Sequence, residues 1–137
     1  MTYMLDTNIC IYAINNRPES LAVRIRGHLK EHQKDDVCIS AITLAELEHG
    51  AAKSSYTAKS TAVLLQFLAV LSVLPFENSA AKEYGSIRAY LEKRGTPIGP
   101  MDMLIAAHAK SEKLILVTNN VREFSRVPDL KIANWTE

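Results

Sequence analysis

Short apolar runs that alternate with longer, helix-like segments restrict the fold of this chain more than any other feature. The clearest run is "LILVT" at residues 114–118, and others occupy residues 3–5, 37–40, 71–76 and 131–135. Each has the length and composition of a buried strand, and most are separated by segments with helical patterning. This alternation predicts an α/β fold in which helices flank a central, mainly parallel sheet.

The expected helices lie between these runs and begin at residues that favour helix starts. Such residues are Asn8, Pro18, Ser40 and Asn78. The predicted helices span residues 9–14, 19–32, 41–52, 56–70, 78–94 and 101–113. The chain of 137 residues is 47% hydrophobic and 23% charged, so we expect one compact domain over residues 1–137.

Charge and cysteine content restrict the function classes only weakly. A formal net charge of +1 neither requires nor excludes nucleic-acid binding. Cys10 and Cys38 lie in apolar runs and form no CxxC motif, which is typical of reduced thiols in a cytoplasmic protein. We expect no signal peptide, and the longest apolar run, at residues 62–76, is too short and interrupted to cross a membrane.

Acidic side chains follow several of the predicted strands. Asp6 comes directly after the first strand, Glu46 and Asp102 lie in the first turns of two helices, and Glu123 follows the strand at 114–118. The carboxyl ends of parallel strands meet at one edge of a sheet, so these acids are expected to converge there. Converging carboxylates repel one another, and a divalent cation relieves that repulsion. Oxygen ligands without thiolates favour Mg²⁺ or Mn²⁺ over zinc.

Each acid also has a structural interpretation. Asp6 can end a strand or cap a helix, Glu46 can complete a capping box with Thr43, and Asp102 can complement a helix dipole. Glu123 can be an ordinary surface acid. Only the combination of all four favours a metal site.

The other residue constellations carry less weight. Glu46 and His49 have the spacing of a di-iron motif, but only one copy occurs. His28 and His32 are four residues apart on a polar helix. They are interpreted as solvated side chains rather than a zinc pair, because the glutamate position of a metalloprotease motif is missing. His108 is interpreted as a packed helix residue.

Four segments in this order resemble the PIN-domain ribonucleases, and more narrowly the VapC toxins of bacterial toxin–antitoxin pairs. They are "MLDTN" at 4–8, "SAITLAELEHGA" at 40–51, "GTPIGPMDMLIAAHA" at 95–109 and "LVTNNVREF" at 116–124. The resemblance covers essentially the whole chain. It implies a Rossmann-like PIN fold, an endoribonuclease that depends on Mg²⁺ or Mn²⁺, a homodimer, and inhibition by a cognate VapB antitoxin in a hetero-oligomer.

The resemblance also implies which residues act. Asp6, Glu46 and Asp102 occupy the acidic positions of the family, where they would hold the metal that activates a water to attack the phosphodiester. The family often has an aspartate at the position of Asn120, which leaves Asn120 and Glu123 as alternatives for a fourth ligand. Supporting polar roles fall to Thr7, Asn8, Ser40 and Thr118, although capping accounts for each of them individually.

Substrate and partner residues are the least specific expectations. Arg122 and Lys53 flank the acidic segments and are candidates for phosphate contact. The segment "GTPIGPMD" resembles that of toxins acting on tRNA, which points to the anticodon region of initiator tRNA and to inhibition of translation. Apolar residues in "ICIYAI" and at 62–71 exceed what one buried stripe needs, which favours a protein partner. The alternatives are a PIN-fold RNA- or protein-binding module with structural acids, a metal-dependent phosphatase, and a structure-specific DNA nuclease.

Overall fold

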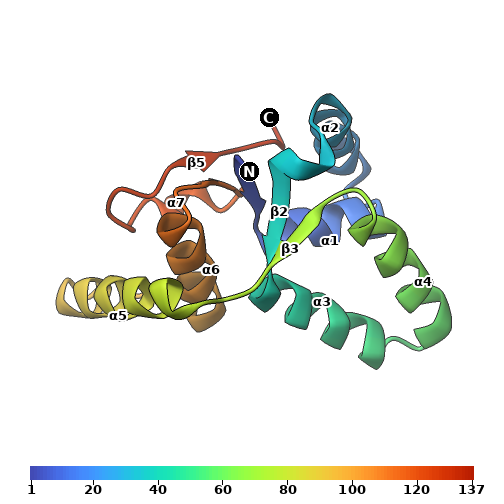
Figure 1. Ribbon diagram of the computed structural model, residues 1–137. Helices are drawn as coiled ribbons and strands as arrows, with labels where there is room; N and C mark the ends of the chain where they lie inside the picture. Colours follow the sequence, from blue (N-terminus) through green and yellow to red (C-terminus); the bar gives the residue numbers. More distant parts are fainter.

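Five parallel strands form the centre of the computed structural model, which describes residues 1–137 (Figure 1). The strands are β1 (Tyr3–Leu5), β2 (Val37–Ser40), β3 (Ser72–Leu74), β4 (Ile115–Val117) and β5 (Ile132–Ala133). Their order in the sheet is β3-β2-β1-β4-β5, so the first strand of the chain is the central one. All four strand pairs are parallel. The expected α/β fold with a central parallel sheet is therefore confirmed.

Helices connect the strands and cover both faces of the sheet (Figure 1). They are α1 (Thr7–Asn15), α2 (Glu19–Glu31), α3 (Ala41–Lys53), α4 (Thr57–Leu68), α5 (Asn78–Lys93), α6 (Pro100–Ser111) and the short α7 (Val121–Phe124), with a 3-10 turn η1 at Lys34–Asp36. Helices α5, α6 and α7 lie on one side of the strands, and α1, α3 and α4 lie on the other. The three layers are helix, sheet and helix.

The alternation of side chains along each strand divides the core in two. Met4, Cys38 and Leu116 pack into the cluster beneath α5 and α6. Their neighbours Leu5, Ile39 and Val117 pack into the cluster on the side of α1, α3 and α4. Because successive strand residues point to opposite faces, a strand covered by helices on both sides has to be apolar throughout. This explains the continuous apolar runs of the sequence.

Several expected helix boundaries are correct and two caps are wrong. The side chain of Ser40 accepts a hydrogen bond from the backbone N–H of Ile42 at 3.0 Å, so the expected cap of α3 is confirmed. Helix α1 begins one residue before Asn8, with Asp6 at the capping position. Asn78 is likewise the first residue of α5 rather than its cap. In both places the chain turns into the helix earlier than the polar residue suggests.

The strand register brings three polar residues to one level at the carboxyl edge of the sheet. Leu5 pairs with Val117 and Met4 with Cys38. Continuing that register places Asp6 beside Thr118 on one side and Ser40 on the other. The backbone N–H of Asp6 donates to the carbonyl of Val117 at 2.9 Å, which fixes the position of the aspartate.

Both cysteines are buried free thiols, as expected. Burial raises the pKa of the Cys10 thiol well above its ordinary value and raises the pKa of Cys38 to about 12, so neither forms a thiolate at neutral pH. None of the helices is both long enough and apolar enough to cross a membrane.

Candidate active site

Asp6 lies at the junction between β1 and α1 and is almost completely buried, with 2% of its surface exposed. Its side chain does not cap α1. Instead, the hydroxyl of Thr118 donates a hydrogen bond to Oδ2 of Asp6 at 2.8 Å. The Thr118 hydroxyl in turn accepts from the backbone N–H of Asn120 at 2.9 Å. The interpretation of Asp6 as a side-chain helix cap is therefore wrong.

The surroundings of Asp6 disfavour its negative charge. Burial raises the pKa of the Asp6 carboxyl from 3.8 to about 6, and the hydrogen bond from Thr118 opposes this rise only in part. The nearby carboxylates of Asp102 and Glu46 raise the pKa further. A buried acid surrounded by other acids is typical of a cation-binding site.

Glu46 projects from α3 toward the same edge of the sheet. The Thr7 hydroxyl donates a hydrogen bond to Oε1 of Glu46 at 2.7 Å, and the Thr43 hydroxyl lies 3.1 Å from the Thr7 hydroxyl. Thr43 is fully buried inside α3, so the capping box predicted from Thr43 and Glu46 is wrong. Because residues three apart share a helix face, Thr43 and Glu46 both face α1. The contact of Thr43 with Thr7 could not be predicted from the sequence, because the two residues are 36 positions apart.

Asp102 lies in the first turn of α6, behind Gly99 and Pro100 at the helix start. Its carboxylate folds back over Gly99, where a Cβ atom would lie 3.4 Å from Oδ2 of Asp102. The pKa of Asp102 is raised, first by burial and then by the charges of Glu123 and Glu46. The interpretation of Asp102 as a helix-dipole partner predicts a lowered pKa, which is the opposite of this direction.

Asn120 and Glu123 close the fourth side of the cluster. Asn120 occupies the capping position of α7, and its side-chain amide donates to Oε2 of Glu123 at 3.1 Å. Glu123 is half-buried and turned back toward Asp102. Asn119 instead donates to the hydroxyl of Tyr12 at 3.2 Å, which ties the end of β4 to α1.

Four carboxylates from distant parts of the sequence thus lie near one another, and the charges of their neighbours contribute to the raised pKa of Asp6 and of Asp102. No three of them have oxygen atoms that all lie within 4.8 Å of one another. This spacing suits an ion that keeps part of its water shell, as Mg²⁺ does, better than a closed cage of protein ligands. The donor set consists of oxygen atoms alone, which is the chemistry that Mg²⁺ and Mn²⁺ prefer.

A groove of about 1500 Å³ leads along α1, α3 and α4 to the acids. Asp6, Glu46 and Asp102 line it at one end. Its cationic lining residues are Arg17, Lys53 and Lys59. Lys53 is predicted from the sequence, whereas nothing in the local sequence of Arg17 and Lys59 distinguishes them from other surface cations. Exposed Arg122 lies on α7 outside this groove.

The remaining polar candidates have different surroundings. Asn8 is exposed and lines the groove. Ser40 is fully buried, and its hydroxyl oxygen lies 2.7 Å from Nδ1 of His108, so it links the start of α3 to α6. The expectation that His108 is a packed helix residue is confirmed. The pKa of His108 is lowered by burial.

Comparisons with known proteins agree with this architecture. The PIN domain family matches residues 3–130. The chain is 46% identical to the tRNA(fMet)-specific endonuclease VapC of Salmonella typhimurium over 135 residues, 98% of each chain. It is 43% identical to ribonuclease VapC2 of Rickettsia felis, again over 98% of each chain.

Solved structures show the same fold. The crystal structure of VapBC2 from Rickettsia felis, bound to a DNA fragment from their promoter, matches with a TM-score of 0.86 at 41% identity over 98% of this chain and 99% of that one. VapBC-1 from nontypeable Haemophilus influenzae matches with a TM-score of 0.85 at 37% identity over both full chains. The chain therefore belongs to the PIN-domain family and, within it, to the VapC ribonucleases.

Proposed function

We propose that this chain is a metal-dependent endoribonuclease toxin that hydrolyses a phosphodiester bond of tRNA and thereby inhibits translation. The observation that carries the proposal is the buried Asp6, whose pKa of about 6 reflects burial and the charges of Asp102 and Glu46. The relatives named as tRNA(fMet)-specific endonucleases support initiator tRNA as the substrate. Residues 1–137 act as one PIN domain in this proposal.

The proposed metal ligands are Asp6, Asp102 and Glu46, with Glu123 acting through water. Mg²⁺ is the expected ion, and Mn²⁺ is expected to substitute for it. When bound, the ion supplies a water of lowered pKa and offsets the charge that develops on the phosphate. In this proposal Asn120 orients a ligand or the phosphate, since its amide carries no charge.

The chain contributes the orientation of these carboxylates. Asp6, Glu46 and Glu123 each have one oxygen held by a hydrogen-bond donor, from Thr118, Thr7 and Asn120 respectively. We propose that the second oxygen of each is the one available to the cation. Such donors behind metal ligands fix their geometry before the ion binds.

The direct test is RNA cleavage followed by mapping of the new ends. RNAs are sequenced after brief induction in cells, and purified protein is incubated with initiator tRNA in Mg²⁺ or in chelator. We expect Mg²⁺-dependent cuts in the anticodon region. Cleavage of duplex DNA or of a small phosphoester, with no cut in RNA, would instead indicate one of the other metal-dependent hydrolases. RNA binding without any cleavage would indicate a binding module, which the asparagine at position 120 favours.

The Glu123→Gln substitution should raise the Mg²⁺ concentration needed for half-maximal cleavage by several fold. Glu123 adds negative charge beside Asp102, and removing that charge weakens cation binding. The measurement is a Mg²⁺ titration of the initial rate. Glu48→Gln, which removes an exposed acid from α3, is the matched control. A titration curve that coincides with that of the wild type would return Glu123 to the role of an ordinary first-turn helix acid.

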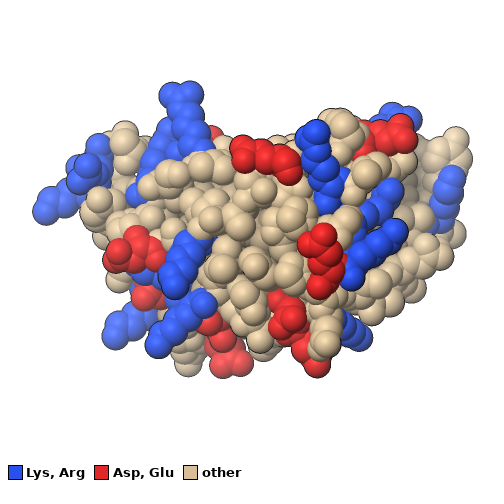
Figure 2. All heavy atoms as spheres, turned by 90° about the horizontal axis from the view of Figure 1, so that it is seen from above, with Lys and Arg blue, Asp and Glu red and all other residues tan.

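RNA has to approach this acidic site along cationic side chains. Figure 2 shows the face on the side of the chain termini, away from the carboxyl edge of the sheet, with Lys and Arg toward both sides and acidic side chains among them. That face therefore offers no continuous basic patch. Lys53 and Lys59 line the groove that ends at the acids, so we propose that they contact phosphate.

The double substitution Lys53→Gln and Lys59→Gln should weaken RNA binding and lower the slope of log affinity against log salt by about 1 to 2. The pair Lys82→Gln and Lys93→Gln on α5 is the matched control. Binding is measured at several salt concentrations with a cleavage-deficient chain. Arg122→Gln is tested in parallel, because phosphate contact by Arg122 stays a prediction. If only Arg122→Gln changes the slope, the RNA follows the α7 side of the acids.

The proposed partners are a cognate VapB antitoxin and a second copy of this chain, in a toxin–antitoxin hetero-oligomer. Solved relatives titled VapBC complexes support the antitoxin. Ile11, Leu65 and Val70 are exposed apolar residues of the two segments in which an apolar excess was predicted. An antitoxin helix in the groove would cover the acids, and a basic side chain is expected to accompany it. Cytoplasmic localisation stays a prediction.

A further inference from the structure

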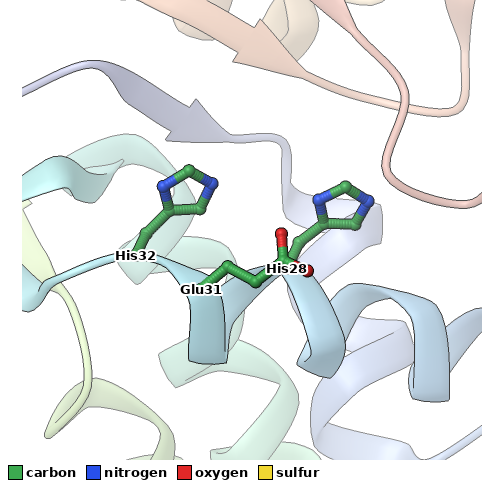
Figure 3. A group of neighbouring side chains, drawn as sticks. All are labelled: His28, Glu31 and His32. Atoms are coloured by element: carbon green, nitrogen blue, oxygen red, sulfur yellow. The ribbon is translucent and has the colours of Figure 1, made fainter.

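A cluster of metal-ligating side chains lies on α2, away from the acids. His28 and Glu31 lie in the last turn of α2, and His32 is the residue that directly follows the helix. One donor atom from each lies within 4.8 Å of the others. Figure 3 shows the two imidazole rings side by side with the Glu31 carboxylate between them. Helix α2 lies near the chain termini, at the edge of the sheet opposite the start of α3 (Figure 1).

Both imidazole rings are held in place by aromatic packing. The rings of His28 and His32 stack on Trp135 with centroid distances of 4.8 and 5.5 Å and interplanar angles of 8° and 7°. Tyr3 packs against His32 at 5.0 Å. Both histidines are half-buried, so their interpretation as solvated side chains is wrong. The ligand orientation is thus largely fixed before any ion binds.

The donors of this cluster are not committed elsewhere. The only histidine side chain with a hydrogen bond inside the chain is His108, and the two ion pairs of the chain do not involve Glu31. Imidazole nitrogen with one carboxylate suits Zn²⁺, Ni²⁺ or Cu²⁺, whereas Mg²⁺ prefers oxygen alone. Tetrahedral zinc spaces its donors by roughly 3.4 Å, and the three donors of this cluster already lie within 4.8 Å of one another.

We propose that His28, Glu31 and His32 bind one transition-metal ion, with Zn²⁺ as the expected occupant, at a site separate from the acids. All three ligands come from the end of α2, and both imidazole rings also stack on Trp135 near the end of the chain. The same end is tied to α2 by Arg24, whose guanidinium donates to the carbonyl of Thr136 at 2.8 Å. An ion at this site stabilises the folded state to which it binds, and the site is independent of the proposed nuclease function.

The single tryptophan of the chain reports directly on this site. Cu²⁺ quenches the emission of an indole that it approaches, so the full-length protein is titrated with Cu²⁺ while Trp135 emission is recorded. We expect saturable quenching with one ion per chain, reversal by Zn²⁺, and no reversal by millimolar Mg²⁺. Zn²⁺ should also raise the melting temperature of the wild type.

Substitutions separate this site from adventitious binding. His28→Gln and His32→Gln should each raise the Cu²⁺ concentration for half-maximal quenching by about tenfold or more. Glu31→Gln leaves the stacked rings untouched and should raise it less. His49→Gln, which changes an exposed histidine on α3, is the matched control and should leave it unchanged. Midpoints rather than amplitudes are compared, since the histidines themselves affect the indole.

Two results would overturn the proposal. Quenching of the wild type that does not saturate, or that is displaced by Mg²⁺, indicates an adventitious ion only. The same holds if Glu31→Gln and both histidine variants have the midpoint of the wild type while circular dichroism shows them folded. If the histidine variants fail to fold, Glu31→Gln and the effect of Zn²⁺ on the melting temperature of the wild type decide. None of these measurements involves RNA, so their failure leaves the nuclease proposal untouched.

Discussion

The Asp6→Asn substitution should lower the rate of RNA cleavage by a factor on the order of 10² or more at saturating Mg²⁺, while the protein stays folded. Asp6 is the most buried of the four acids, and it is the one whose pKa both Asp102 and Glu46 raise. Asparagine preserves its shape and can still accept the hydrogen bond from Thr118. Only the charge that is proposed to hold the cation is lost.

Cleavage is measured on initiator tRNA with purified protein over a range of Mg²⁺ concentrations. The matched control is Asp35→Asn, which removes an exposed aspartate in the turn η1. It should cleave at the wild-type rate. Wild-type activity in Asp6→Asn would refute the assignment of Asp6 as a metal ligand, because the substitution keeps the shape of the side chain and removes only its negative charge.

The same substitution should stabilise the metal-free protein above pH 6, by an amount on the order of 3 kcal/mol. The folded pKa of Asp6 is about 6, against an ordinary value of 3.8, so the folded state binds the proton more tightly than the unfolded state. The stability that this proton provides is fully present below about pH 4 and is lost as the pH rises to about 6. Asparagine stays neutral throughout and avoids this loss.

The measurement is the free energy of unfolding in urea, with a chelator present, at several pH values between 4 and 8. We expect the wild type to lose stability over the lower half of this range and Asp6→Asn to lose much less. Asp35→Asn should follow the wild type. A variant that is less stable than the wild type at pH 7 without metal would mean that the Asp6 carboxylate serves the fold rather than a cation.

The sequence predicted the architecture because periodicity is a local property. The runs at 3–5, 37–40 and 114–118 are apolar on both faces, and this pattern is typical of strands covered by helices on both sides. The position of Asp6 at the end of the first strand then followed from the rule that sites form at the carboxyl edge of parallel sheets. The same rule brought Glu46, Asp102 and Glu123 to that edge, and the family resemblance assigned the acidic positions of the family to Asp6, Glu46 and Asp102.

What the sequence did not predict depends on contacts between distant elements. The local pattern of Thr43 and Glu46 matches a capping box, but Thr7 on α1 takes Glu46 away from its own helix. Arg17 and Lys59 line the same groove as the acids only because α1 and α4 form two of its walls. The histidines of α2 appeared solvated because their partner, Trp135, lies at the other end of the chain.

The central position of β1 has a consequence for the order of events during synthesis. Strand β1 (Tyr3–Leu5) leaves the ribosome first, yet one of its two neighbours in the sheet, β4, is among the last strands to be made. The hydroxyl that donates to Asp6 belongs to Thr118, which is 112 residues later in the chain. A nascent chain that ends before Thr118 therefore contains Asp6 without its orienting partner and without Glu123. The acidic cluster is assembled only when the chain is nearly complete, so an unfinished copy still on the ribosome has no formed site.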